Sequence, residues 1–371
     1  MRALFVLQSG QFLYGASRSI EGLLKNIDFE FDLMICKSFT KNVDEEAIRR
    51  RFGDNLKNIY VVWLPRYRCQ FFDNHGIYSE LSHYVNNIMA MLLRGIRKRI
   101  IRKGKYDYIH LNSLVLYPMI DEESKYIIHA REIINPSYQL KKLLVNKVKK
   151  AFGIIYIDDA TKVSVEKEYL HPKTLLLNNP FDMTAVIEID YMRTMKQYNL
   201  SEDTTVFAML GQIGKSKGSD IVFDAFHKVD NDDIRLLVLG NNENPFAKQM
   251  MDMYKEDKRI IFCGELENTA PIYRICDYVF RGEDQFCIGR TIFEGLYAGC
   301  SVIMPGEERD IERVPEGEKW KTKIYFYRPK DIEDLCRIIR QVLNNKMINR
   351  QYYSNVDEYV KEYTKYIGDI L

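Results

Sequence analysis

Short apolar runs alternate with amphipathic stretches along the whole chain. Each run is rich in β-branched or aromatic residues and ends near a turn signal, which predicts a buried strand. The stretches between the runs carry apolar residues at helical spacing, so the pattern predicts βα units that build parallel sheets. The predicted strands are Ala3–Leu7, Phe31–Cys36, Ile59–Leu64, Tyr108–Leu111, Tyr126–His129, Ile154–Ile157, Thr174–Leu177, Val206–Leu210, Leu236–Gly240, Ile260–Cys263, Tyr278–Phe280, Ser301–Met304 and Ile324–Tyr327.

A turn at residues 178–180 separates the strands into two sets. Asn179 precedes Pro180, and the residue before a proline is pushed out of helical geometry. A chain of 371 residues is also long enough for two α/β domains. We therefore expect one domain over 1–185 and a second over 186–350. Residues 351–371 should form a helix that packs back towards the first domain through one tyrosine face, formed by Tyr359, Tyr363 and Tyr366.

The composition, 46% hydrophobic and 29% charged residues, is that of a folded globular protein. Seven scattered cysteines lack the close spacing of metal-binding motifs and favour a reduced compartment. The first apolar run, from Ala3 to Leu7, is too short for a signal peptide, and no run is long enough to span a membrane. A cytoplasmic location is expected.

Charge is distributed unevenly between the two halves. Residues 1–185 carry 28 Lys and Arg against 20 Asp and Glu, whereas residues 186–371 carry 26 against 32. Two basic helices are predicted in the first half, at Arg94–Lys105 and Lys141–Lys150. Either helix could be an ordinary solvated face, but together they favour peripheral contact with an anionic membrane, on the inner face of the cell membrane. Nucleic acid is not expected, because no binding module accompanies the charge.

The segment Phe286–Met304 predicts a loop, a helix and then a strand. Gly289 would let the loop approach a ligand closely, and the amides of Arg290 and Thr291 at the helix N-terminus could hold a diphosphate. Glu294 lies one turn into this helix, where its carboxylate could accept hydrogen bonds from two ribose hydroxyls. This segment predicts a nucleotide-binding site.

A second glycine-rich loop follows the predicted strand Val206–Leu210. It begins at Gly211 and contains Lys215 and Lys217. Ligands of doubly wound sheets bind at the carboxyl ends of strands, where Lys217 could neutralise charge on a departing diphosphate. Either loop alone is a weak signal, since such turns occur in α/β proteins of every function.

The order and spacing of the two loops resembles the nucleotide-sugar half of the retaining family-four glycosyltransferases. That family has a Gly-Arg-x5-Lys-Gly loop before a Glu-x7-Glu motif. The resemblance implies the GT-B fold, in which two Rossmann-like doubly wound domains face each other across a cleft. It also implies transfer of a hexose from a UDP- or GDP-sugar to an acceptor hydroxyl, with retention of configuration. A lipid-linked or oligosaccharide acceptor in bacterial cell-surface polysaccharide synthesis would fit, and no metal or other cofactor is expected.

The chain departs from the family motifs at two positions. Gly211 and Lys217 match the first motif, but Gln212 stands where arginine is usual. Glu294 matches the ribose-binding glutamate of the second motif. Phe286 stands at the first glutamate, and the nearby acidic pair, Glu283 and Asp284, could substitute by a loop shift.

The first half matches the family more loosely. Gly15 lies in a segment that resembles the family's first glycine loop, although a plain strand–helix turn would look the same. Asn112 stands at a strand end where many relatives carry a catalytic-site histidine. Lys217, Asn112 and Glu283 are therefore the catalytic candidates. The acceptor-side candidates, at the end of another strand, are His129, Arg131 and Glu132, with a structural role for His129 as the alternative.

Two other functions remain open from the sequence. The departures at Gln212 and Phe286 favour a catalytically silent subunit that binds nucleotide sugar or acts as a scaffold. A nucleotide-sugar 2-epimerase would share the fold, but would need further acid–base residues that the sequence does not identify.

Overall fold

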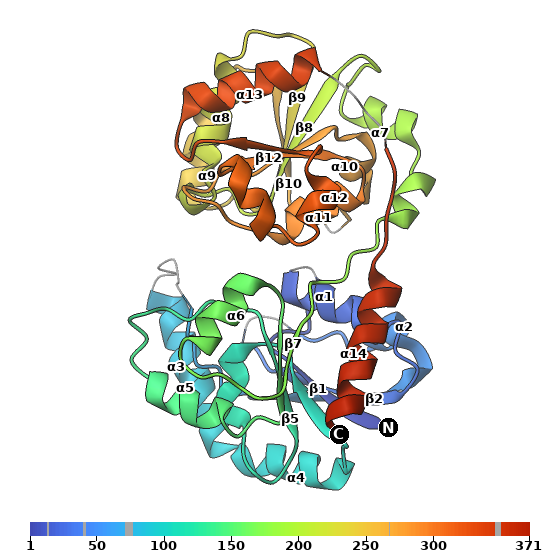
Figure 1. Ribbon diagram of the computed structural model, residues 1–371, viewed down its shortest axis with the longest axis vertical. Coiled ribbons are helices and arrows are strands. Elements are labelled where there is room, and N and C mark those ends of the chain that lie inside the picture. Colours follow the sequence, from blue (N-terminus) through green and yellow to red (C-terminus); the bar gives the residue numbers. More distant parts are fainter. Residues whose placement is uncertain (13–14, 40–41, 71–76, 267, 346–349) are drawn as a thin grey trace. The chain divides into compact units, whose positions relative to one another are not determined.

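The structure is a computed structural model that describes residues 1–12, 15–39, 42–70, 77–266, 268–345 and 350–371. The chain divides into two compact units (Figure 1). The N-terminal unit comprises Met1–Pro180 together with Val356–Leu371, and the C-terminal unit comprises Phe181–Asn355. The first unit thus ends slightly before residue 185. An antiparallel bridge between Asp182 and Ser354 joins the two segments that lead into the C-terminal unit.

The strands of the N-terminal unit form a parallel sheet in the order β3-β2-β1-β4-β5-β6-β7. The order reverses between β1 and β4, which makes this pair the topological switch point, where open α/β sheets bind ligands. The strands are β1 (Arg2–Leu7), β2 (Glu30–Cys36), β3 (Leu56–Val62), β4 (Tyr108–Leu111), β5 (Tyr126–Ala130), β6 (Gly153–Tyr156) and β7 (Thr174–Leu176).

Helices cover both faces of this sheet. On one face α1, α2 and α14 pack on Phe5, Phe31 and Tyr108, and the tyrosines of α14 lie buried in that core as their spacing predicted. The other core includes side chains of α5, of α6 and of the 3-10 helix η2 (Leu114–Met119). The helices are α1 (Gly15–Leu24), α2 (Glu45–Phe52), α3 (Ile77–Leu92), α4 (Arg94–Gly104), α5 (Lys141–Val148), α6 (Asp159–Glu166) and α14 (Val356–Ile370).

The predicted basic helix Arg94–Lys105 forms as α4, separate from the helix that precedes it. Helix α3 ends at Leu92, and α4 starts afresh at Arg94 after the non-helical Leu93. The guanidinium of Arg97 turns back to donate to the carbonyl of Ala90 in the last turn of α3. Arg97 satisfies a carbonyl that would otherwise have lost its helical partner.

The C-terminal unit repeats the architecture with the strand order β10-β9-β8-β11-β12-β13, and its switch point lies between β8 and β11. Its strands are β8 (Thr205–Leu210), β9 (Ile234–Leu239), β10 (Ile260–Gly264), β11 (Tyr278–Phe280), β12 (Ser301–Pro305) and β13 (Ile324–Tyr327). Its helices are α7 (Tyr191–Gln197), α8 (Ser219–Lys228), α9 (Pro245–Met253), α10 (Ala270–Ile275), α11 (Arg290–Tyr297), α12 (Gly317–Trp320) and α13 (Ile332–Asn344).

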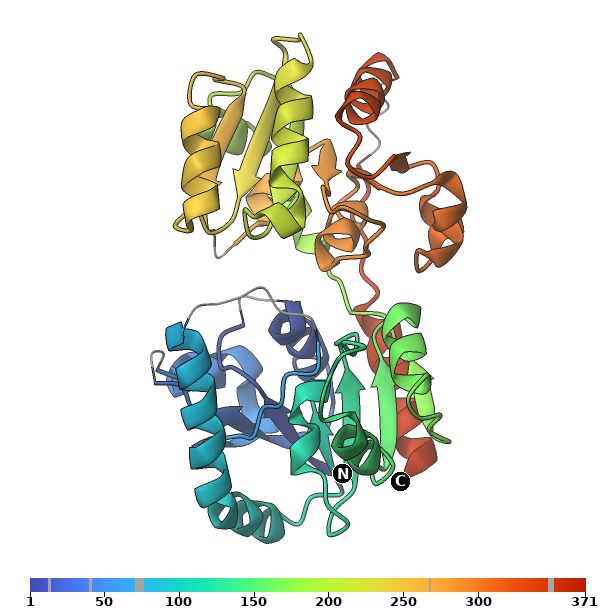
Figure 2. The same ribbon diagram turned by 90° about the vertical axis from the view of Figure 1, so that its left-hand side faces the viewer.

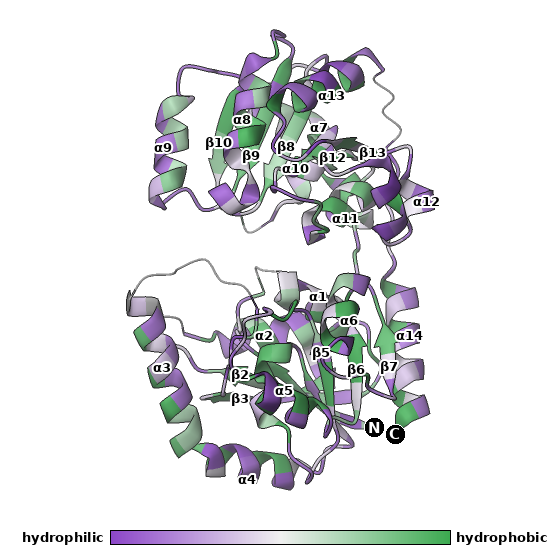
Figure 3. Cartoon of the chain, turned by 60° about the vertical axis from the view of Figure 1, so that its left-hand side comes forward, coloured by the Kyte–Doolittle hydropathy of each residue, from purple (hydrophilic) through white to green (hydrophobic). Residues whose placement is uncertain are grey.

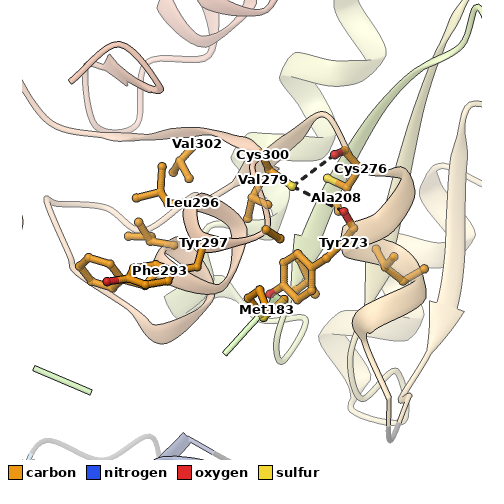
Figure 4. Close-up of a cluster of buried hydrophobic side chains, with 14 of the residues drawn as sticks. Met183, Ala208, Tyr273, Cys276, Val279, Phe293, Leu296, Tyr297, Cys300 and Val302 are labelled. Carbon is orange, nitrogen blue, oxygen red and sulfur yellow. Dashed lines mark hydrogen bonds between the residues drawn. The ribbon is translucent and has the colours of Figure 1, made fainter. Parts of the chain in front are cut away.

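The two faces of the C-terminal sheet have separate cores. Helices α8 and α13 pack side by side on one face (Figure 1). Helices α10 and α11 contribute Tyr273, Leu296 and Tyr297 to the other core, which Figure 4 shows in close-up. None of the helices within the described residues combines the length and hydropathy needed to cross a bilayer.

Candidate functional site

Two loops meet at the switch point of the C-terminal sheet. One loop follows β8 and contains the short 3-10 helix η4 (Lys215–Lys217), and the other follows β11 and leads to α11. The loops touch through their backbones at Gly218 and Gly282. A Cβ on Gly218 would lie 1.5 Å from the carbonyl oxygen of Gly282, and a Cβ on Gly282 would lie 2.3 Å from that of Gly218. Gly218 also has φ +59°, so both positions need glycine.

A cluster of buried charges joins these loops. Arg281 donates from Nε to Glu283 Oε2 over 3.1 Å, and from Nη2 to Oε1 of the same carboxylate. Lys217 Nζ lies 3.5 Å from Glu283 Oε1. Glu283 and Arg281 are buried, whereas the Lys217 side chain is 42% exposed. Two cations against one carboxylate leave the cluster with one net positive charge, which favours an anionic ligand.

Arg281 also reaches the beginning of α11. Its Nη1 donates to Thr291 Oγ1 over 2.8 Å, and a Cβ on Gly289 would lie 2.7 Å from Nη1. Arg281 and Gly282 were not among the residues predicted from the sequence, although both directly follow a predicted strand. Their position directly after a strand at the switch point could have identified them as site residues, but neither residue occurs in the family motifs.

Tyr273 and Arg290 hold Glu294 in place. Its Oε2 accepts a hydrogen bond from the Tyr273 hydroxyl over 2.9 Å, and its Oε1 accepts one from Arg290 Nε over 2.8 Å. The Arg290 guanidinium also lies over the ring of Phe181, 4.7 Å from its centroid. The side chain of Arg290 therefore orients Glu294, whereas the predicted diphosphate contact concerns the backbone amide of Arg290.

Phe286 packs against protein. Its ring lies 6.4 Å from that of Phe326, and the guanidinium of Arg313 lies 4.2 Å from its centroid. Two acidic residues lie close to Phe286 in the sequence. Glu283 joins the charged cluster, whereas Asp284 is exposed and pairs with Lys330. Of the two acidic residues that could replace the missing glutamate, Glu283 lies with Lys217.

The other residues of the C-terminal unit that were predicted to bind the donor nucleotide sugar lie in the loop after β8. Gln212 borders a small pocket together with Lys217, Arg281 and Glu283. Gly211 has φ +128° and is exposed, and Lys215 is exposed as well. The structure thus brings Gln212 to the charged cluster. Within the part of the chain that the structure describes, Lys215 forms no hydrogen bond or ion pair with that cluster.

A second polar network lies at the carboxyl edge of the N-terminal sheet. The side-chain Nδ2 of Asn112 donates to the carbonyl of Ala16 over 3.1 Å, and its Oδ1 accepts from Arg131 Nε over 3.1 Å. Arg131 Nη1 donates to Asn179 Oδ1 over 2.7 Å. The structure thus brings Asn112 and Arg131 together, near the start of α1, where Gly15 is exposed.

Glu132 and His129 extend this network inwards. Glu132 accepts hydrogen bonds from the Ser113 hydroxyl and from the Leu114 amide, yet burial raises the pKa of its carboxyl. His129 is buried, its Nε2 has no partner within the described residues, and burial keeps its pKa well below the usual value. His110 packs edge-on against His129 and bonds the Tyr363 hydroxyl through Nδ1, so it belongs to the core beneath the network.

Two Rossmann-like units with loops assembled at their switch points define the GT-B class. Residues 190–363 match the profile of the family described as "Glycosyl transferases group 1". This match covers most of the C-terminal unit and slightly less than half of the chain, and it supports the resemblance drawn from the sequence. The GT-B fold that the resemblance implies is confirmed.

Among known proteins, the chain is 26% identical over 287 residues to a glycogen synthase of Anoxybacillus flavithermus. That alignment covers 72% of this chain and 54% of the relative, so the chain spans about half the length of the curated relatives it matches. Crystal structures show the same fold in HepE of Anabaena, in complex with UDP and glucose, with a TM-score of 0.71, 16% identity and 99% of both chains covered. WaaG, a glycosyltransferase involved in lipopolysaccharide biosynthesis, gives a TM-score of 0.63 at 10% identity over 99% of this chain and 95% of its own.

Proposed function

We propose that the protein transfers a sugar from a UDP- or GDP-sugar to an acceptor hydroxyl, with retention of configuration. The observation that carries the proposal is the charged cluster of Lys217, Arg281 and Glu283 at the switch point of the C-terminal sheet. It lies where doubly wound sheets bind ligands, and its net positive charge suits a diphosphate.

Three side chains of the C-terminal unit, those of Glu294, Lys217 and Glu283, have roles in the proposed reaction. Glu294, fixed by Tyr273 and Arg290, accepts hydrogen bonds from the ribose hydroxyls, since each carboxylate oxygen has a second lone pair. Lys217 stabilises the charge that grows on the leaving diphosphate. Glu283 takes the sugar contact that the residue at Phe286 does not provide. The chain's own cations would then supply the electrostatic stabilisation without a metal.

For the acceptor, the proposal uses the N-terminal unit. Asn112, Arg131 and Glu132 form a fixed polar network that could orient a hydroxyl acceptor. A lipid-linked or oligosaccharide acceptor of bacterial cell-surface polysaccharide synthesis is proposed, with the protein in the cytoplasm and held peripherally on anionic membrane. The basic surface of α4 and α5 supports this placement.

A second candidate function is a catalytically silent subunit that binds nucleotide sugar. One observation favours it: the Glu283 carboxylate is buried and already neutralised by Arg281, so sugar contact would compete with an existing ion pair. The two candidates share donor binding and differ only in turnover.

The test is incubation of the purified protein with a panel of labelled UDP- and GDP-sugars, with and without EDTA, followed by assay of nucleoside diphosphate release. Release that persists in EDTA and is lost in Lys217→Ala would support the proposed transferase. The exposed Lys215→Ala variant is the matched control and should retain activity. Donor binding without release for any sugar would favour the silent subunit.

A further inference from the structure

Helix α3 presents a hydrophobic face to solvent. Six large apolar side chains of α3 are between 51% and 89% exposed, and they recur at helical spacing along one face. We call this face the α3 stripe; it consists of Tyr78, Leu81, Tyr84, Ile88, Met91 and Leu92. Large exposed apolar faces on folded proteins mark surfaces that contact a partner or a membrane.

The opposite face of α3 holds the helix on the unit through polar contacts. Asn86 is 1% exposed and donates to the Leu64 carbonyl over 2.9 Å. Asn87 accepts from the Arg66 amide over 2.8 Å and donates to the Arg66 carbonyl over 3.1 Å. The helix therefore turns amides inwards and apolar side chains outwards, which reverses the usual arrangement of a helix on a globular protein. Exposure of the stripe is a consequence of these specific contacts.

Charge next to the stripe identifies the kind of partner. Helices α3 and α4 follow one another along one edge of the N-terminal unit (Figures 2 and 3). The stripe itself carries no charge, whereas exposed cations begin with the first residue of α4. Arg94, Arg99 and Lys103 are exposed and form no ion pair with any residue that the structure describes. An apolar face bordered by exposed cations fits the interface of an anionic bilayer.

Other basic residues of α4 are less available to lipid than the sequence suggested, because they contact groups of the protein itself. Arg97 is buried and donates to the Trp63 carbonyl over 2.9 Å. Lys98 and Arg102 both pair with Glu123, at 2.6 Å and 3.2 Å. Charge alone would therefore attract lipid less strongly than the number of basic residues suggests, and apolar contact gains importance.

A pocket of about 200 Å³ lies between the end of the stripe and α4. Met91, Arg94, Lys98 and Lys147 are among its lining residues, together with a single carboxylate, that of Asp121. Burial and the nearby Arg94 lower the pKa of Lys147. These cations repel one another, and an anionic group in the pocket would relieve that repulsion.

We propose that the α3 stripe inserts between the lipids of an anionic bilayer, while Arg94 and Lys147, which line the adjoining pocket, hold the phosphate of one lipid headgroup. The inference deepens the peripheral membrane contact of the proposed function and rests on it for its biological role. Lipid binding, however, is measured without any sugar nucleotide, so its failure is distinguishable from failure of the proposed transfer reaction.

The first experiment is co-sedimentation with vesicles of phosphatidylcholine alone or mixed with phosphatidylglycerol. The triple variant Leu81→Gln, Ile88→Gln and Met91→Gln should lose affinity for the anionic vesicles by at least about tenfold, because three apolar side chains no longer leave water. The matched control changes Ile187, Met192 and Met253 of the C-terminal unit to Gln; these are 54–62% exposed and should leave binding unchanged. Equal pelleting of the two triple variants would overturn the proposal.

The second experiment locates the stripe directly. The Tyr84→Trp variant should show fluorescence quenching by anionic vesicles with brominated acyl chains, whereas the buried Trp63 and Trp320 of the unaltered protein should not. Part of the quenching should persist at 1 M salt, where the Debye length shrinks to about 3 Å and charge attraction is screened. Vesicle binding without quenching would overturn insertion. So would a lipid-free dimer that becomes a monomer in the Leu81, Ile88 and Met91 variant, because the stripe would then cover a second copy of the chain.

Discussion

Glu294 shows how a residue can be prepared for a ligand before the ligand arrives. Tyr273 of α10 donates to one oxygen of its carboxylate, and Arg290, which lies in α11 together with Glu294, donates to the other. Burial of Tyr273 and the neighbouring Glu294 keep the pKa of the tyrosine hydroxyl well above its usual value, so it remains a donor at physiological pH. The carboxylate therefore needs little rearrangement to accept ribose hydroxyls.

Replacement of Glu294 by Ala should weaken binding of the cognate nucleotide at least about tenfold. The loss corresponds to charge-assisted hydrogen bonds of about 1.5–3 kcal/mol. Calorimetric titration with UDP and GDP measures it, and Tyr273→Phe, which keeps the carboxylate but removes the hydroxyl donor, should have a smaller effect. An unchanged dissociation constant in a folded Glu294→Ala variant would contradict the ribose assignment.

The Arg281–Glu283 pair allows stability to be separated from catalysis. Arg281→Gln alone leaves a buried carboxylate without its main partner, which should destabilise the C-terminal unit by about 3–5 kcal/mol. The double variant Arg281→Gln, Glu283→Gln removes both charges and should recover most of that loss in chemical denaturation. If Glu283 contacts the sugar, turnover should stay low in the double variant. Turnover that recovers together with stability would make the pair purely structural.

At the scale of elements, the donor site depends on how closely the loops after β8 and β11 approach. The Gly218–Gly282 contact leaves no space for a side chain on either loop. The loops carry Lys217 and Glu283 respectively, so the contact sets the distance between the two charges. Glycine here serves the geometry of the site and not the stability of either strand.

Gly282→Ala should therefore impair the site more than the fold. The new Cβ would push the loops apart, at a cost of about 1–3 kcal/mol for overpacking, and nucleotide affinity should fall with it. Gly368→Ala is the matched control, because a Cβ at that helical position meets nothing within 4 Å. Thermal unfolding and calorimetry on both variants give the comparison, and wild-type affinity in Gly282→Ala would show that the loops tolerate separation.

At the scale of the whole molecule, the buried histidines couple folding to pH. Burial lowers the pKa of His110 to about 3 and that of His129 well below its usual value, so both are neutral when folded. The unfolded chain takes up these protons below a pH of about 6.5. The stability that the neutral histidines permit is thus complete above that pH and is lost as the pH falls towards 3. Burial raises the pKa of Glu132, so this carboxyl changes the free energy of unfolding in the opposite direction, and only at acidic pH.

The free energy of unfolding should fall by up to about 1.4 kcal/mol per pH unit for each histidine between pH 6 and 4. Urea denaturation at a series of pH values measures this slope. His110→Leu should remove the contribution of one histidine, while the Tyr363 hydroxyl keeps its 3.1 Å contact with Tyr108. An identical slope in His110→Leu would mean that this histidine is already accessible to protons in the native state.

The sequence by itself determined the two sheets and the domain class. Each strand of the structure lies within a few residues of its prediction, because strands of a parallel sheet are buried on both faces and appear as short apolar runs. The loop–helix signal around Gly289 and Glu294 was equally local, since helix N-termini and glycines act through neighbouring residues. These features depend on spacing along the chain, and spacing is visible without a fold.

Only the tertiary structure decided which charges meet and which face of a helix is covered. Arg281, Glu283 and Lys217 come together because the strand order places β11 beside β8, an arrangement that no local pattern records. Two inward asparagines, Asn86 and Asn87, turn the α3 stripe to solvent, and their partners lie in a segment distant along the chain. Hydrophobic spacing identifies a helical face, whereas its burial depends on long-range hydrogen bonds that compete with the hydrophobic effect.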